Sequence, residues 1–169
     1  MSYRNKTYVA FASEDIHLYR LMEAWRDNDK IDFDFYDAHD LFISRDTSSR
    51  ETIRRNLRER LKNALQVVLI GTVDARKKGG DGYSFLSHEV NIIMEFQLPI
   101  VIANKGGSRA VETSFIPQPL LDKSYYTIST SFQPAIIRYA LDNYAAGFKS
   151  STNKGAYYYK DQSYKNLGL

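Results

Sequence analysis

The chain contains no cysteine among its 169 residues. This absence excludes disulfides, thiol nucleophiles and cysteine-ligated metal sites, and it fits a reducing compartment. No apolar run reaches the roughly 20 residues that a helix needs to span a bilayer. The polar residues 1–6 lead directly into an apolar run typical of a strand. We therefore expect a cytoplasmic protein with no membrane partner.

Several motifs that mark common ligand sites are also missing. The sequence has no phosphate-binding P-loop and no GxGxxG dinucleotide motif. Its three histidines, His17, His39 and His88, lack metal-ligand spacing, so we expect each at the surface or as a cap, and no metal site. The 23 basic and 20 acidic side chains are interspersed and leave a net charge of only +3, so no nucleic-acid partner is expected.

Short apolar runs alternate with segments whose apolar residues recur at helical spacing. We expect strands at residues 7–11, 31–36, 65–70, 98–103 and 125–128. This alternation indicates an α/β fold of the flavodoxin-like kind, with three layers, a five-stranded parallel sheet in the order 2-1-3-4-5 and helices on both faces. Residues 31–36 alternate apolar and acidic side chains, which indicates an edge strand.

The remaining segments predict helices, loops and a tail. We expect Ser13 to cap a first helix at residues 15–26, and Ser48 or Ser49 to cap a second that ends near residue 63. The polar stretch 73–82 is expected to be flexible. One domain is expected at residues 1–146, followed by a Tyr-rich C-terminal tail at 147–169 that packs on it.

One carboxylate stands out against this background. In open parallel sheets, ligands bind outside the carboxyl ends of the strands, beside the switch point in strand order. Those ends are residues 11–13 and 70–72 in this chain. Glu89 lies in the first turns of a helix, inside the otherwise apolar segment 85–94, and we expect it to face the same crevice.

The residues around this crevice exclude two functions of the flavodoxin-like fold. A phospho-acceptor receiver domain needs an aspartate after the third strand, where this chain has Gly71 and Thr72. A flavodoxin needs a phosphate loop after the first strand, but Glu14 and Asp15 would repel phosphate. A lone carboxylate instead suits cleavage at the anomeric carbon of a nucleoside, because it stabilises oxocarbenium charge. If nicotinamide leaves from NAD, it departs neutral and needs no general acid.

Four stretches resemble a known family. They are Thr-Tyr-Val-Ala-Phe-Ala-Ser-Glu-Asp at 7–15, Phe-Tyr-Asp-Ala at 35–38 with its loop to Ser48, Val-Val-Leu-Ile-Gly-Thr at 67–72, and Phe-Leu-Ser-His-Glu-Val at 85–90. Together they resemble TIR-like domains of bacterial antiphage defence, most closely the TIR-like (ThsB-type) subunit of Thoeris systems. The resemblance spans about residues 7–145. It implies that 1–146 is a TIR-like domain.

The resemblance also implies an activity and its partners. NAD would be the substrate rather than a bound cofactor, and Glu89 the catalytic residue of an NAD glycohydrolase or ADP-ribosyl cyclase. The product would be an ADP-ribose-type signal, cyclic or linear, that diffuses to a separate effector protein. A phage-derived trigger and a homo-oligomer are further partners that such a system allows.

By the same resemblance, several residues would bind the substrate. Phe85 stands four residues before Glu89, where relatives often carry tryptophan, and would keep an aromatic wall. The loop 37–49 would correspond to the loop that gates or assembles TIR domains. The residues expected to line the NAD pocket are Phe11, Ala12, Ser13, Asp37, Gly71 and Thr72.

Two other functions stay open at this point. A non-catalytic TIR-like adaptor would act through its surfaces, with Glu89 exposed on its helix beside His88. A nucleoside deoxyribosyltransferase-like enzyme would use the glutamate as a nucleophile. It would exchange bases on deoxynucleosides and ignore NAD.

Overall fold

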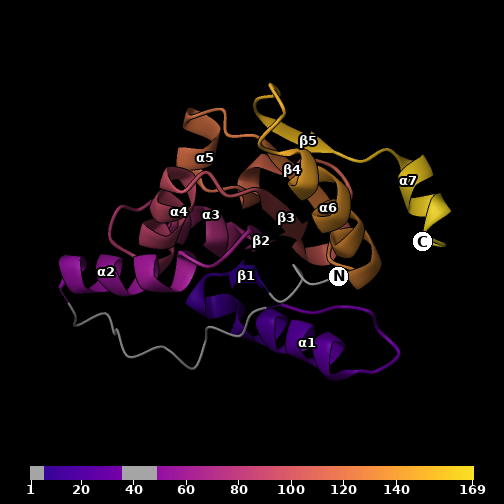
Figure 1. The fold of residues 1–169 in the computed structure, drawn as a ribbon, viewed down its shortest axis with the longest axis horizontal. Helices are drawn as coiled ribbons and strands as arrows, with labels where there is room; N and C mark the ends of the chain where they lie inside the picture. Colours follow the sequence, from indigo (N-terminus) through magenta and orange to yellow (C-terminus); the bar gives the residue numbers. More distant parts are fainter. Residues whose placement is uncertain (1–5, 36–48) are drawn as a thin grey trace.

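The structure is a computed structural model, and it describes residues 6–35 and 49–169. Five parallel strands form one sheet in the order β1-β2-β3-β4-β5 (Figure 1). The strands are β1 (Thr7–Ala10), β2 (Gln66–Gly71), β3 (Ile100–Asn104), β4 (Thr127–Ser131) and β5 (Ala156–Tyr158). Every residue of β2 and β3 is buried, as expected for apolar strands covered on both faces.

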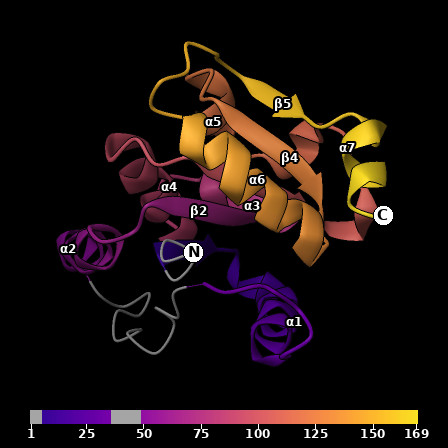
Figure 2. The same cartoon turned by 45° about the vertical axis from the view of Figure 1, so that its right-hand side comes forward.

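Helices cover both faces of this sheet (Figures 1 and 2). One core cluster joins one face to helices α2 (Arg50–Leu61), α3 (Val73–Gly79), α4 (Phe85–Glu95) and α5 (Gln118–Asp122). A second cluster joins the opposite face to α1 (Ile16–Asp27) and α6 (Pro134–Gly147). The short α7 (Asp161–Asn166) follows β5, and single 3-10 turns lie at Ser13–Asp15, Lys105–Gly107 and Thr113–Phe115. The predicted α/β fold class is confirmed.

The strand order differs from the predicted 2-1-3-4-5. Residues 31–35 do not form a strand in the structure, although Phe33 and Phe35 are buried as their alternation predicted. Both rings pack on α1, where Trp25 meets Phe33 edge-on with centroids 5.5 Å apart. The alternation of apolar and acidic residues therefore indicates an extended segment with one buried face. Such a segment can be buried without pairing to a neighbouring strand.

The fifth strand comes from the C-terminal tail. β5 pairs with β4 and forms one edge of the sheet, and α7 lies beyond it (Figure 2). Tyr164 of α7 is fully buried, and its hydroxyl accepts a hydrogen bond of 3.0 Å from the Ser131 backbone nitrogen. The guanidinium of Arg109 lies 4.2 Å from the centre of the Tyr164 ring. These contacts fix the tail, although its sequence has no clear periodicity.

Two predictions about helix starts need correction. The segment 73–82, expected to be flexible, begins with α3, because the Thr72 hydroxyl accepts a hydrogen bond of 2.9 Å from the Ala75 backbone nitrogen and caps the helix. Ser13 does not cap α1; its hydroxyl bonds to Glu14 instead, at 2.7 Å. Ser49 caps α2 as predicted, accepting from the Thr52 nitrogen at 3.2 Å.

Candidate active site

Glu89 lies on the buried side of α4. Leu86, Glu89, Val90 and Ile93 follow one another at the spacing of a single helix face, and all are at most 3% exposed. The chain enters α4 through a turn in which the Asp81 carboxylate accepts hydrogen bonds from the backbone nitrogens of Tyr83 and Ser84, at 3.0 and 2.7 Å. The helix packs on the sheet face that also carries α2 and α3, so Glu89 points into the core.

The carboxylate of Glu89 meets a phenol from the first strand. Tyr8 of β1 is 3% exposed, and its hydroxyl donates a short hydrogen bond to Glu89 Oε2. Neighbouring strand residues point to opposite faces, so Tyr8 and Ala10 face α4 while Val9 faces α1 and α6. The partner of Glu89 thus comes from the middle of β1, three residues before Phe11.

A buried cation completes this cluster. Arg60 of α2 is 5% exposed, and its guanidinium lies 5.7 Å from the centre of the Phe85 ring. A hydrogen bond and the positive charge of Arg60 favour the ionised phenol of Tyr8, and its charge favours the ionised form of Glu89. We call Tyr8, Arg60, Phe85 and Glu89 the Glu89 cluster; its members come from β1, α2 and α4.

Burial sets the ionisation of the cluster. Loss of solvent raises the pKa of Glu89 to about 7, against the opposing effects of the Tyr8 hydrogen bond and the Arg60 charge. Burial, followed by the charge of Glu89, raises the pKa of Tyr8 well above its usual range. Tyr8 is therefore a neutral hydrogen-bond donor at neutral pH, while Glu89 exchanges a proton close to that pH.

A second group of side chains joins the carboxyl ends of β1 and β2. The Thr72 hydroxyl donates to Asp15 Oδ2 at 2.5 Å, and the two residues are 3% and 2% exposed. Burial raises the pKa of Asp15, and the hydrogen bond from Thr72 opposes that change. Gly71 allows close contact with β3, because a Cβ there would lie 2.9 Å from Ile102 Cγ2.

The structure divides the predicted pocket residues among different surroundings. Ala12, Gly71 and Thr72 are buried at the strand ends, and Ser13 beside them is exposed. Phe85 belongs to the Glu89 cluster. Phe11 packs on the opposite sheet face from Phe85, stacked on Tyr19 with centroids 4.7 Å apart. Asp37, His39 and the loop from 37 to 48 lie outside the described residues.

His88 does not lie at the surface as predicted. It is 1% exposed, and its Nδ1 accepts a hydrogen bond of 3.5 Å from Arg54 Nε. Burial, together with the charges of Arg54 and Arg50, lowers its pKa. Since His88 and the adjacent Glu89 are both buried, the interpretation of Glu89 as an exposed helix residue is wrong.

Sequence reasoning missed Tyr8, Arg60 and Asp15. A signal for Arg60 was present, because it follows Ile53 by seven residues and Leu57 by three and so falls on the apolar stripe of α2. Tyr8 looked like an ordinary aromatic strand residue. The sequence shows Asp15 only as an acidic residue that would repel phosphate, and the packed strand ends reveal its bond to Thr72.

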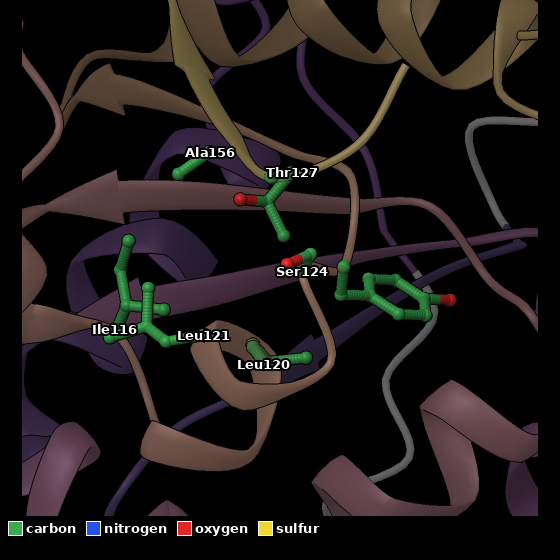
Figure 3. A pocket seen from close by; sticks show the side chains of 8 residues that line it. Ile116, Leu120, Leu121, Ser124, Thr127 and Ala156 are labelled. Carbon is green, nitrogen blue, oxygen red and sulfur yellow. The ribbon is translucent and has the colours of Figure 1, made fainter. Parts of the chain in front are cut away.

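A cavity of about 70 Å³ lies elsewhere, between α5, β4 and β5 (Figure 3). It shares no residue with the Glu89 cluster; its walls are Ile116, Leu120, Leu121, Ser124, Tyr125, Thr127, Gly155 and Ala156.

Within residues 6–35 and 49–169, no group of three or more acidic or histidine side chains is arranged to hold a metal ion. None of the helices in the same ranges has the length and apolar character needed to cross a bilayer.

Comparison with known families places most of the chain in one of them. The family described as "Thoeris protein ThsB, TIR-like domain" matches residues 8–107, more than half of the chain. The matched segment runs from β1 through β3 and contains every member of the Glu89 cluster. A comparison with curated proteins gives no significant match.

Proposed function

This chain belongs to the TIR-like domain family of Thoeris ThsB proteins, and on that premise we propose that it cleaves NAD with Glu89 as the catalytic carboxylate. The product is an ADP-ribose-type signal of antiphage defence, which diffuses to a separate effector protein. NAD is the substrate, and the chemistry requires no metal or additional cofactor.

The reaction breaks the bond between the nicotinamide nitrogen and C1′ of the ribose. The bonding electron pair goes to the nicotinamide, which leaves neutral, and C1′ becomes an oxocarbenium ion. The Glu89 carboxylate stabilises that positive charge, an effect that is large in a buried site of low dielectric. Water then attacks C1′, releases one proton to the solvent and gives linear ADP-ribose, or a nucleophilic nitrogen of the same molecule's adenine attacks C1′ and closes a ring.

The observation that carries this proposal is the burial of the Glu89 carboxylate. A buried carboxyl group reduces stability unless it is protonated or well paired, so its presence in a core helix calls for an explanation other than packing. Its pKa near 7 lets an appreciable fraction be ionised at neutral pH. A strongly perturbed carboxylate with specific polar partners is a common property of catalytic sites.

The burial has a consequence for substrate access. Glu89 is 3% exposed and Tyr8 occupies one of its oxygens. The ribose can therefore reach the carboxylate only after neighbouring side chains move. Phe85 is the first residue of α4 and is half-buried, which makes it the most exposed member of the cluster.

The test compares cells that make the native chain, Glu89→Gln or Glu95→Gln. Glu95 provides a matched control, because it lies on the same helix but is exposed and pairs with Arg58 through two oxygens at 2.6 and 2.7 Å. Mass spectrometry of small-molecule extracts after phage infection measures NAD and new ADP-ribose-related species. We expect NAD loss and a new species with the native chain and Glu95→Gln, and neither with Glu89→Gln.

Two results would point to other functions. Equal NAD levels with all three chains, despite folded protein, would favour a non-catalytic adaptor. Base exchange between deoxynucleosides, with NAD untouched, would favour a deoxyribosyltransferase-like enzyme.

A further inference from the structure

The Glu89 cluster contains more than a catalytic carboxylate. We propose that Tyr8 is a positioning residue whose hydroxyl, beside the buried Arg60 guanidinium, holds the Glu89 carboxylate in a fixed orientation for catalysis. This inference rests on the function proposed above. It adds a role for a strand residue and a helix residue that sequence reasoning did not single out.

The geometry places three groups in series from three elements. The Tyr8 phenol lies on β1 and donates to Glu89 on α4, and the Arg60 guanidinium reaches the phenol from α2. Two further contacts hold α2 against α4: Arg58 binds Glu95 at 2.6 Å, and Arg54 donates to His88 at 3.5 Å. These two contacts fix α2, and with it Arg60, in position relative to α4.

The charged and titratable groups that act on Glu89 come from different sides. Tyr8 faces it from β1 and Arg60 faces it from α2. On α4 itself, His88 precedes it and is directed to Arg54, while Glu95 pairs with Arg58. On α3, Arg76 is directed away, toward the Thr113 carbonyl at 2.6 Å. Tyr8 and Arg60 are therefore the two groups whose removal should change the ionisation of Glu89.

The physical effect of the phenol is to stabilise one protonation state. A hydroxyl that donates to a carboxylate favours its charged form, so loss of the hydroxyl raises the carboxyl pKa. We expect Tyr8→Phe to raise the Glu89 pKa by about one pH unit above its native value, which lowers the ionised fraction at neutral pH several-fold. The orientation of the carboxylate is lost at the same time, since no other donor on β1 takes the place of the phenol.

The experiment measures Glu89 directly, without relying on turnover. Protein labelled with carbon-13 at the glutamate carboxyl carbons is titrated by NMR, and Glu89→Gln identifies the Glu89 signal by its disappearance. The variants are Tyr8→Phe, Arg60→Gln and Arg60→Lys. The control is Tyr144→Phe, which removes another buried hydroxyl, one that accepts from the Ile100 nitrogen at 2.9 Å and donates to the Tyr126 carbonyl at 2.6 Å.

We expect the Glu89 midpoint to rise in Tyr8→Phe and Arg60→Gln and to stay near its native value in Arg60→Lys and Tyr144→Phe. In the NAD assay, the acid limb of the pH–rate profile should move to higher pH in Tyr8→Phe, with a lower kcat and a nearly unchanged KM. An unchanged midpoint in folded Tyr8→Phe overturns the proposal. If Tyr8→Phe does not fold, an unchanged midpoint in Arg60→Gln overturns it equally.

The NMR measurement separates this inference from the proposed function. A raised midpoint in Tyr8→Phe supports the role of Tyr8 in holding Glu89 ionised. If the native protein then consumes no NAD in infected cells, the proposed function fails while the Tyr8–Glu89 relationship stands.

Discussion

Tyr8 and Glu89 are 81 positions apart in the chain, and the hydroxyl of the first donates a hydrogen bond to the carboxylate of the second. The fold creates this pair by packing α4 on the sheet face to which Tyr8 points. Both residues are 3% exposed, so the bond lies in a region of low dielectric where its effect on ionisation is large. The local physics of this pair determines how the candidate site responds to pH and to mutation.

Glu89 should make the stability of the protein fall as pH rises. Its folded-state pKa of about 7 lies above the ordinary value of 4.5, so between these values the folded protein holds a proton that the unfolded chain has released. The stabilising contribution is therefore complete below pH 4.5 and lost by about pH 7, a total of about 3 kcal/mol. Urea unfolding of the native chain and Glu89→Gln across this range measures it.

The difference in unfolding free energy between the native chain and Glu89→Gln gives the contribution of Glu89 alone, because other titrating groups such as Asp15 and His88 are present in both. We expect the native chain to lose stability relative to Glu89→Gln as pH rises, so that the variant is the more stable of the two at pH 8. A difference that stays constant with pH would mean that burial does not perturb this carboxyl group.

Loss of the Thr72 hydroxyl should destabilise the strand ends. In Thr72→Val, the Asp15 carboxylate loses its donor at 2.5 Å and α3 loses its cap. We expect a decrease in unfolding free energy of about 1–3 kcal/mol, because a buried acceptor is left unpaired. Thr72→Ser keeps the hydroxyl and should retain most of the stability. Native stability in folded Thr72→Val would contradict a stabilising role for the hydroxyl.

Gly71 should not tolerate a side chain. A Cβ at this position would lie 2.9 Å from Ile102 Cγ2 and 3.2 Å from Asn104 Oδ1, in a fully packed part of the sheet. We expect Gly71→Ala to lower the unfolding free energy by about 1–3 kcal/mol. Gly147→Ala is the control, since the added Cβ at the end of α6 would meet no atom within 4 Å apart from its chain neighbours and the backbone of its own helix, and it should be neutral or slightly stabilising. Chemical denaturation of both variants gives the comparison.

The sequence was sufficient to predict the fold class and the position of the buried strands, because β2 and β3 are continuous apolar runs with β-branched residues. It wrongly predicted a strand at residues 31–35, and it did not predict strand β5 in the C-terminal tail. Phe33 and Phe35 are buried by aromatic contacts with α1, and β5 forms by parallel hydrogen-bonded pairing with the edge of β4. Both outcomes depend on tertiary packing that local periodicity does not contain.

For the candidate site, the sequence identified Glu89 and placed it in a helix. It did not predict that the carboxylate is buried, because that depends on how α4 is rotated against β1 and α2. Tyr8 fits its strand as an ordinary aromatic residue, and the position of Arg60 on the apolar stripe of α2 indicates burial but not its partners. Their relationship to Glu89 becomes visible only when the three elements are packed together.

The most direct test of this account measures nicotinamide release from NAD labelled with carbon-13 in the nicotinamide ring. Lysates of phage-infected cells that contain either the native chain or Glu89→Gln are used, because they retain any trigger that infection supplies. Labelled free nicotinamide should accumulate in lysates that contain the native chain. In lysates that contain Glu89→Gln, it should stay at the background level measured in cells that lack the protein. Equal release by both folded proteins would contradict the assignment of Glu89 as the catalytic carboxylate.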